Sequence, residues 1–345
     1  MRVNRIALNG FRNYDFETAD FSPGTNVIYG ENAQGKTNLL EAVYILAAGK
    51  SFRTRFDREQ TVRIVMRNGV RKQITVNSVK KTATELAGTL TAVLFSPDDL
   101  NLIKEGAAAR RRLMDNAISQ IRPRYAEYLS QFNKLYESKT RILKDWREKP
   151  SLLDTLDDFS DGMCRYSAQL IRYRAAFIER LREEAAPIHS EFSGAGESLS
   201  IEYSTVSSVK NPLGSAKEIY YDLCEHWESR RTAEIDSQQC LTGAHKDDLI
   251  ITINGQNARS FASQGQTRTA ALSIKLAERE IYLDETGEYP ILLLDDVLSE
   301  LDTRRQEFVL NRIGGGQTLI TCCEDEGISK RTGGKVMHVE KGRIR

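Results

Sequence analysis

The chain has 345 residues, with 49 lysines and arginines against 48 aspartates and glutamates. Because single domains usually run to roughly 100–200 residues, this length allows one large core or two domains. A charged fraction of 28%, with 23 glycines and 7 prolines, is ordinary for a globular protein. This composition excludes disorder, a collagen-like repeat or a disulfide scaffold as the main architecture. The formal charge of +1, taken alone, does not point to any class of partner.

The N-terminus and the cysteines indicate the compartment. Residues 1–9 alternate between polar and apolar side chains and lack the apolar core of a signal peptide. No apolar run approaches the roughly 18 residues that a membrane-spanning helix needs. Five cysteines without any C-x-x-C spacing are typical of reduced thiols. We therefore expect a cytosolic (cytoplasmic) protein with no membrane partner.

Strand patterns dominate the first third of the chain. Asn68-Gly69 lies between two apolar segments and favours a hairpin, because both turn positions need a positive φ. Ser96-Pro97 ends the last apolar segment of this region. We expect strands at 26–29, 62–66, 73–77 and 89–95 and a helix at 38–47.

The middle of the chain, from about residue 107 to 237, is mostly helical in pattern. Apolar residues recur at three- and four-residue steps over 125–146, which predicts a helix of about 25 residues that Pro150 stops. A second stripe over 156–181 predicts another helix, which ends near Pro187. Stripes of this kind are usually the inner faces of paired helices, so we expect an arm or cap rather than a cofactor site.

Strand patterns return near residue 248. The run Ile291–Leu294 is apolar throughout, as in a strand buried on both faces of a largely parallel sheet. The first and last thirds therefore predict one α/β domain with a helical insertion. We expect strands at 248–253, 291–294 and 318–322 and a helix at 264–283. The expected domain divisions are 1–104 and 243–345 for the two parts of the α/β domain and 105–242 for the inserted arm.

The strongest local motif is Gly30-Glu31-Asn32-Ala33-Gln34-Gly35-Lys36-Thr37, which matches G-x-x-x-x-G-K-[ST] between a predicted strand and a predicted helix. Successive backbone N–H groups of such a loop converge on the β-phosphate of a nucleotide at the positive end of the helix. Lys36 would reach the β- and γ-phosphates, and the Thr37 hydroxyl would bind Mg²⁺. The motif therefore predicts a nucleotide and Mg²⁺ site.

Two acids, Asp295 and Asp296, end the apolar strand at 291–294. An acid at this place typically holds Mg²⁺ beside the phosphates, which is the role expected of Asp295. Asp296 could orient or deprotonate the attacking water. Taken alone, the pair could also be a polar strand end or a cap for a helix near Thr303.

A third motif, Ala262-Ser263-Gln264-Gly265-Gln266, opens the helix that precedes the acidic strand and resembles the L-S-G-G-Q signature of ABC-type ATPases. In those proteins the signature binds the γ-phosphate held by the opposite subunit, so the resemblance implies nucleotide-binding roles for Ser263, Gly265 and Gln266. A hydroxyl, a glycine N–H and a helix dipole all favour an anion. By itself, Ser263 could equally be an ordinary N-cap.

The interval between Lys36 and Ser263 is far longer than in a transporter domain, yet too short for the long coiled coil of SMC-type proteins. With this spacing, the chain resembles the RecF family of bacterial recombination mediators over essentially its whole length. Three segments support the resemblance: Pro97–Leu100 followed by Arg110–Asp115, Gly243–Leu249, and Asp295–Asp302. The sequence departs from the family at Glu105-Gly106-Ala107 and at Thr267.

The resemblance implies an α/β, ABC-type (SMC/RecF-like) P-loop ATPase head with an inserted, mostly helical arm. It implies that ATP and Mg²⁺ drive a homodimer that holds duplex DNA at gap junctions and helps load RecA, with RecR and RecO as partners. Lys36, Asp295 and Asp296 would carry a weak, DNA-stimulated hydrolysis that works as a conformational switch. Slow hydrolysis is expected because Asp296 is short and no histidine follows the strand at 318–322.

Positive charge gathers between residues 50 and 81. Ten basic and two acidic residues give this segment a charge of +8, which leaves −7 for the rest of the chain. A basic stripe on hairpin strands suits phosphate contacts without base readout, but it could also be a solvated edge that discourages strand pairing. The resemblance favours DNA, whereas the function of the triple Arg110-Arg111-Arg112 stays open. The expected DNA contacts are Lys50, Arg53, Arg55, Arg63, Arg67, Arg71 and Lys72.

Two other classes of function are kept as alternatives. One is an ABC-type transport ATPase subunit, against which the inserted arm and the missing histidine argue. The other is an ATPase linked to DNA cleavage, which needs an appended metal-nuclease domain that the sequence does not indicate.

Overall fold

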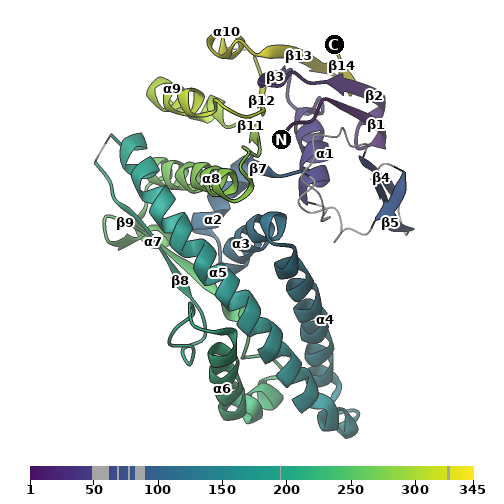
Figure 1. The fold of residues 1–345 in the computed structure, drawn as a ribbon, viewed down its shortest axis with the longest axis vertical. Coiled ribbons are helices and arrows are strands. Elements are labelled where there is room, and N and C mark those ends of the chain that lie inside the picture. The colour runs from purple at the N-terminus through teal and green to yellow at the C-terminus, as the bar shows by residue number, and fades with distance from the viewer. Residues whose placement is uncertain (49–61, 68–69, 77, 82–89, 195, 325–326) are drawn as a thin grey trace. The chain divides into compact units, whose positions relative to one another are not determined.

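A computed structural model describes residues 1–48, 62–67, 70–76, 78–81, 90–194, 196–324 and 327–345. The chain divides into two compact units (Figure 1). The first unit comprises residues 1–101, 184–198 and 263–345, and the second comprises 102–183 and 199–262. An α/β unit is thus interrupted twice by segments of the second unit.

The first unit is built on a six-stranded sheet with the order β14-β13-β3-β12-β11-β7. All neighbouring strands are parallel except the β13–β14 pair. All five residues of β11 are buried, which confirms the apolar strand that the sequence predicts. The strand bounds are β3 Thr25–Tyr29, β7 Ala92–Phe95, β11 Ile291–Asp295, β12 Thr318–Cys322, β13 Lys335–Glu340 and β14 Arg343–Ile344.

Helices and two smaller sheets complete the first unit. Leu39 and Val43 of α1 are fully buried in one cluster with Ile28, Leu293 and Leu319 of the sheet, and this packing fixes the helix after the glycine loop. The helices are α1 Lys36–Ala48, α8 Gln264–Thr286, α9 Thr303–Arg312 and α10 Ile328–Thr332, with short 3₁₀ turns at Pro97–Leu100 and Leu298–Glu300. The smaller sheets are antiparallel: β1 Arg5–Phe11 with β2 Tyr14–Asp20, and β4 Val62–Arg67 with β5 Val70–Val76 and β6 Val79–Lys81. The antiparallel pairing of β4 with β5 confirms the expected pair of strands, whereas the predicted Asn68-Gly69 turn lies outside the described residues.

The second unit combines helices with a three-stranded antiparallel sheet of order β10-β9-β8. Asn254 and Gly255 both have positive φ and connect β9 to β10, as their sequence predicts. Helix α4 contacts α5 through ring pairs such as Tyr125 with Tyr173, so the two apolar stripes do face each other. The elements are α3 Ala107–Ile121, α4 Pro123–Asp145, α5 Leu156–Phe192, β8 Leu199–Ser204, α6 Ala216–Ser237, β9 Asp248–Ile253, β10 Gln256–Asn257 and α7 Ala258–Phe261, with α2 Asn101–Lys104 at the junction and 3₁₀ turns at Pro150–Thr155 and Ala244–Lys246.

Helix α5 does not end near Pro187, and the sequence-based prediction of its end is wrong. The helix continues to Phe192 with Pro187 inside it. Proline removes one backbone donor, but Ile188, His189 and Phe192 of the next turn are all buried, and their burial stabilises this turn.

The unit boundaries differ from the predicted domain divisions at three places, the first being residues 102–104, which group with the helical unit. Residues 243–262 group with the helical unit, because β9 pairs along its whole length with β8. Residues 184–198, the end of α5 and the turn after it, group with the α/β unit. Local sequence patterns locate the elements but do not show these long-range pairings.

The cysteines and the lengths of the apolar helices bear on the expected compartment. All five cysteines lie among the described residues, and none of them forms a disulfide bond. None of the described helices is both long and apolar enough to cross a lipid bilayer.

Candidate functional site

The glycine loop, residues 30–37, connects β3 to α1 in the first unit. Gly30 has φ +152°, and a Cβ placed on it would lie 2.2 Å from the carbonyl oxygen of Val339. Gly35 has φ +118°, and a Cβ there would lie 2.7 Å from the side-chain amide of Asn13. Both positions therefore require glycine for their backbone angle and for the close approach of neighbouring segments.

Lys36 is the first residue of α1, and its side chain folds back into the loop. Its Nζ donates to the carbonyl oxygens of Gly30 at 2.5 Å and Glu31 at 3.0 Å. The side chain is almost completely buried. A lysine enclosed by its own loop at a helix N-terminus places a positive charge where phosphate oxygens would bind.

Asp295 ends β11 and lies beside the loop. The Thr37 hydroxyl donates to Asp295 Oδ1 at 2.9 Å, and the Thr321 hydroxyl of β12 donates to the same oxygen at 2.7 Å. The structure thus brings together Thr37 and Asp295, the two residues predicted to hold Mg²⁺. A hydroxyl and a carboxylate are hard oxygen ligands, so the donor set fits Mg²⁺.

Asp296 follows in an unusual backbone conformation, with φ +52°. Its N–H donates to the Thr321 hydroxyl at 2.9 Å, while the Ser299 hydroxyl donates to its carbonyl oxygen at 2.8 Å. Aspartate tolerates the left-handed region better than most residues, and the two hydrogen bonds hold this one there. The chain therefore turns sharply after Asp295, and the two neighbouring acids have different environments.

Sequence patterns missed the support that the β1–β2 hairpin gives to the glycine loop. The Asn13 amide donates to the Gln34 carbonyl at 2.8 Å and accepts a bond from Asn38 at 2.8 Å, while the Tyr14 hydroxyl donates to the Gly35 carbonyl at 2.9 Å. The local signal is a tight turn, in which Arg12 has φ +56°. Nothing in that signal indicates the loop as its partner.

The signature segment forms the start of α8. Ser263 is the N-cap: its hydroxyl accepts from the Gln266 N–H at 3.2 Å, and the Gln266 side-chain oxygen accepts from the Ser263 N–H at 2.9 Å. This is a capping box, so the ordinary N-cap role of Ser263 is present. It does not exclude nucleotide binding, because Ser263 is exposed at the positive end of a 23-residue helix, with Gly265 in its first turn.

Comparisons with known proteins agree with this geometry. A family model described as the RecF/RecN/SMC N-terminal domain matches residues 2–343. A DNA replication and repair protein RecF from Acetivibrio thermocellus is 39% identical over 367 residues, with 99% of each chain covered. The RecF protein of Listeria innocua is 40% identical over 376 residues, with both chains covered completely. The chain belongs to the RecF family.

Solved structures confirm the fold class. A structure of the recombination mediator protein RecF with ATP has a TM-score of 0.89 and 34% sequence identity, and the match covers 99% of this chain and 96% of that one. An SMC head domain from Pyrococcus furiosus, 16% identical with a TM-score of 0.54, shares the fold. The expected ABC-type, SMC/RecF-like ATPase head with an inserted arm is therefore correct, and the chain is a member of a DNA replication and repair family.

The residue after β12 is a cysteine, where the resemblance to ABC-type ATPases would lead one to expect a histidine. Cys323 follows β12 directly, and its thiol lies 3.2 Å from the Asn32 side-chain oxygen of the glycine loop. A thiol here supplies a weak hydrogen-bond donor instead of an imidazole.

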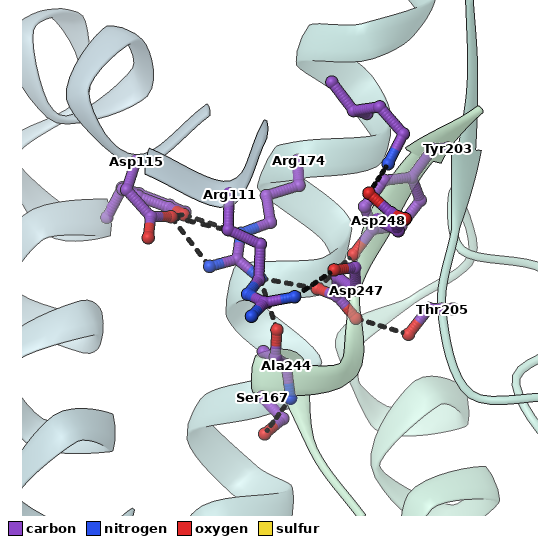
Figure 2. A network of polar contacts seen from close by, with 11 residues as sticks. Arg111, Asp115, Ser167, Arg174, Tyr203, Thr205, Ala244, Asp247 and Asp248 are labelled. Carbon is purple, nitrogen blue, oxygen red and sulfur yellow. Dashed lines mark hydrogen bonds and ion pairs between the residues drawn. The ribbon is translucent and has the colours of Figure 1, made fainter. Parts of the chain in front are cut away.

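The family segment Gly243–Leu249 belongs to a buried polar network of the second unit, around Arg174 of α5 (Figure 2). The Arg174 guanidinium donates to Asp247 at 2.6 Å, to the Ala244 carbonyl at 2.7 Å and to Asp115 at 2.7 Å. Burial raises the pKa of Asp247, and the charge of Arg174 opposes that rise. The network fixes the segment to α3 and α5.

Two of the three arginines in Arg110-Arg111-Arg112 also contact this segment. Arg110 is buried and forms an ion pair with Asp248 at 2.6 Å, while Arg111 donates to the Asp247 carbonyl at 2.8 Å. The structure thus gives Arg110 and Arg111 a role in holding the unit together.

The predicted DNA-binding residues are only partly described. Arg63 and Arg67 lie on β4, and Arg71 and Lys72 lie on β5, so the backbone places four of them on one hairpin. Lys50, Arg53 and Arg55 lie outside the described residues.

Proposed function

We propose that this chain is an ATP-dependent DNA clamp that acts in recombinational repair and replication restart in the cytosol. The observation that carries the proposal is the contact between Thr37 and Asp295, because it joins the glycine loop to the acidic strand beside a buried lysine. ATP binding by a RecF protein of the same fold supports it.

In this proposal Lys36 leaves its two loop carbonyls and donates to the β- and γ-phosphates of ATP. Thr37 and Asp295 hold Mg²⁺, which when bound neutralises charge that develops on these phosphates. Asp296 orients the attacking water and receives its proton. Hydrolysis is slow, because Asp296 has a short side chain and Cys323 replaces a histidine.

ATP on the glycine loop of one subunit meets Ser263 of a second copy, which closes a two-fold dimer. We expect Ser263→Arg to bind ATP with wild-type affinity and to remain monomeric with ATP in light scattering, because the larger side chain blocks the approach of the second copy. Ser215→Arg is the matched control: Ser215 caps α6 with an equivalent capping box, so this variant loses a similar cap outside the signature. A Ser263→Arg protein that dimerises normally would contradict a dimer in which Ser263 meets the ATP of the other copy.

The basic hairpin of residues 62–81 contacts the phosphates of duplex DNA in the closed dimer. We expect the triple change Arg63→Glu, Arg67→Glu and Arg71→Glu to weaken duplex binding by about tenfold or more and to reduce its salt slope by about 3, because each arginine that meets a phosphate releases a counterion. Fluorescence anisotropy at several salt concentrations measures both quantities.

The control for this experiment is the same charge reversal on α4, at the exposed residues Arg124, Lys134 and Arg141. If the hairpin variant binds with unchanged affinity at fixed salt, the hairpin is only a solvated edge. If both variants lose affinity equally, net charge rather than the hairpin determines binding.

We propose that the clamp binds duplex DNA at gaps and has RecR and RecO as partners. Its proposed task is to help load RecA. Membership in a DNA replication and repair family supports this role.

A further inference from the structure

The end of α5 and the turn after it pack against the helices of the first unit. We call residues 184–198 the return segment; the chain on both sides of it belongs to the second unit. Glu191 of this segment forms an ion pair with Arg312 of α9, and Phe192 stacks on Phe308 at a centroid distance of 4.5 Å. The return segment is thus attached to the helix that follows the acidic strand.

Glu197 of the return segment also reaches the signature. Its Oε1 accepts a hydrogen bond from Gln266 Nε2 at 2.7 Å. The other end of the same amide, Gln266 Oε1, accepts the Ser263 N–H at 2.9 Å. The Gln266 side chain therefore bridges Glu197 and the backbone of Ser263.

This bridge works in only one orientation of the Gln266 amide. A carboxylate only accepts hydrogen bonds, so Glu197 requires the NH₂ group of Gln266 to face it. The amide oxygen must then face Ser263, whose N–H needs an acceptor. A flipped amide would turn its NH₂ group toward the Ser263 N–H and its oxygen toward the carboxylate, and both hydrogen bonds would be lost.

Glu197 also lies beside a buried histidine. His189 of α5 is fully buried, and its Nε2 lies 3.5 Å from Glu197 Oε2. The other ring nitrogen lies 3.4 Å from the hydroxyl of Ser273 on α8. The carboxylate therefore sits between the end of α5 and the signature helix, with its side chain about a quarter exposed.

We propose that Glu197 is a positioning residue of the signature motif. By fixing the Gln266 amide, it holds the cap of α8 in the form in which Ser263 accepts the Gln266 N–H and keeps its hydroxyl proton free. That proton is then available to a phosphate oxygen of the ATP bound by the second copy. This inference rests on the proposed function, because it needs a dimer in which Ser263 meets the nucleotide of the partner.

The experiment compares Glu197→Ala, Glu197→Gln and Glu191→Ala. We expect Glu197→Ala to bind ATP as a monomer within about twofold of wild type but to dimerise with ATP about tenfold more weakly, since one charge-assisted hydrogen bond is lost. Glu197→Gln should retain most of the dimerisation, because its carbonyl oxygen can still accept from Gln266. Glu191→Ala should dimerise like wild type, although it removes an ion pair from the same segment.

A double-mutant cycle with Gln266→Ala distinguishes positioning from general stability. Because both residues act through one bridge, the effects of Glu197→Ala and Gln266→Ala on dimerisation should not add. Additive effects, or an equal loss of ATP affinity in the monomer, would overturn the positioning role. If Glu197→Ala dimerises normally while Ser263→Arg does not, this inference is wrong but the proposed ATP-dependent dimer stands. If Ser263→Arg also dimerises, the proposed function itself is wrong.

Discussion

Lys36→Met should lower the affinity for ATP by about 100-fold or more. The ammonium group is enclosed by the loop at 2.5 Å and 3.0 Å from two carbonyl oxygens, where it is prepared to donate to phosphates. Each charge-assisted hydrogen bond is worth about 1.5–3 kcal/mol, so losing two corresponds to at least two orders of magnitude in binding. Isothermal titration with ATP and Mg²⁺ measures the change.

The fold of this variant should remain intact, because methionine fills the buried path of the lysine stem without placing a charge in it. Lys330→Met, an exposed lysine of α10 in the same unit, is the control and should bind ATP like wild type. Wild-type affinity in Lys36→Met would mean that the glycine loop does not bind the nucleotide phosphates.

Arg174→Met should lower the free energy of unfolding by about 3–5 kcal/mol, because it leaves the buried Asp247 without a cation. Tyr203 and Thr205 still donate to Asp247, at 2.5 Å and 2.7 Å, but they bring no charge (Figure 2). Chemical denaturation at neutral pH measures the loss. Arg165→Met on the same helix is the control, since its ion pair with Asp161 is exposed and contributes little to stability.

The loss of unfolding free energy in Arg174→Met should also depend on pH. Burial raises the pKa of Asp247 even in the presence of Arg174, so a protonated Asp247 favours the folded state relative to the unfolded chain. The stability that a protonated Asp247 contributes is fully present below its pKa in the unfolded chain. It is lost as the pH rises through its pKa in the folded protein. The difference in unfolding free energy between wild type and Arg174→Met should therefore become smaller at acid pH. A difference that stays constant with pH would contradict the charge-based explanation.

The candidate nucleotide site could be located from the sequence because its parts are local. A strand, a glycine loop and a helix follow one another from Thr25 to Ala48, and each has its own periodic pattern. Asp295 could be assigned because it ends an apolar strand, and parallel strands place their carboxyl ends at the same edge of a sheet. The contact of Asp295 with Thr37 shows that the two motifs lie side by side, as a shared site requires, while their roles in binding stay predictions.

Contacts between distant segments could not be predicted in this way. Asn13 supports the loop only because the β1–β2 hairpin lies against it, and Glu197 reaches Gln266 across 69 positions of the sequence. The grouping of β9 with the helical unit likewise depends on its pairing with β8. The helix after Pro187 continues because its side chains are buried, which the local effect of proline does not show.

The most direct test of the account is the mass of the wild-type protein in light scattering with ATP and with ADP, each with Mg²⁺ and with or without duplex DNA. We predict that ATP gives twice the 39.0 kDa of the single chain and that ADP leaves the monomer. A protein that stays monomeric with ATP under all these conditions, or that dimerises equally with ADP, would contradict the ATP-dependent clamp.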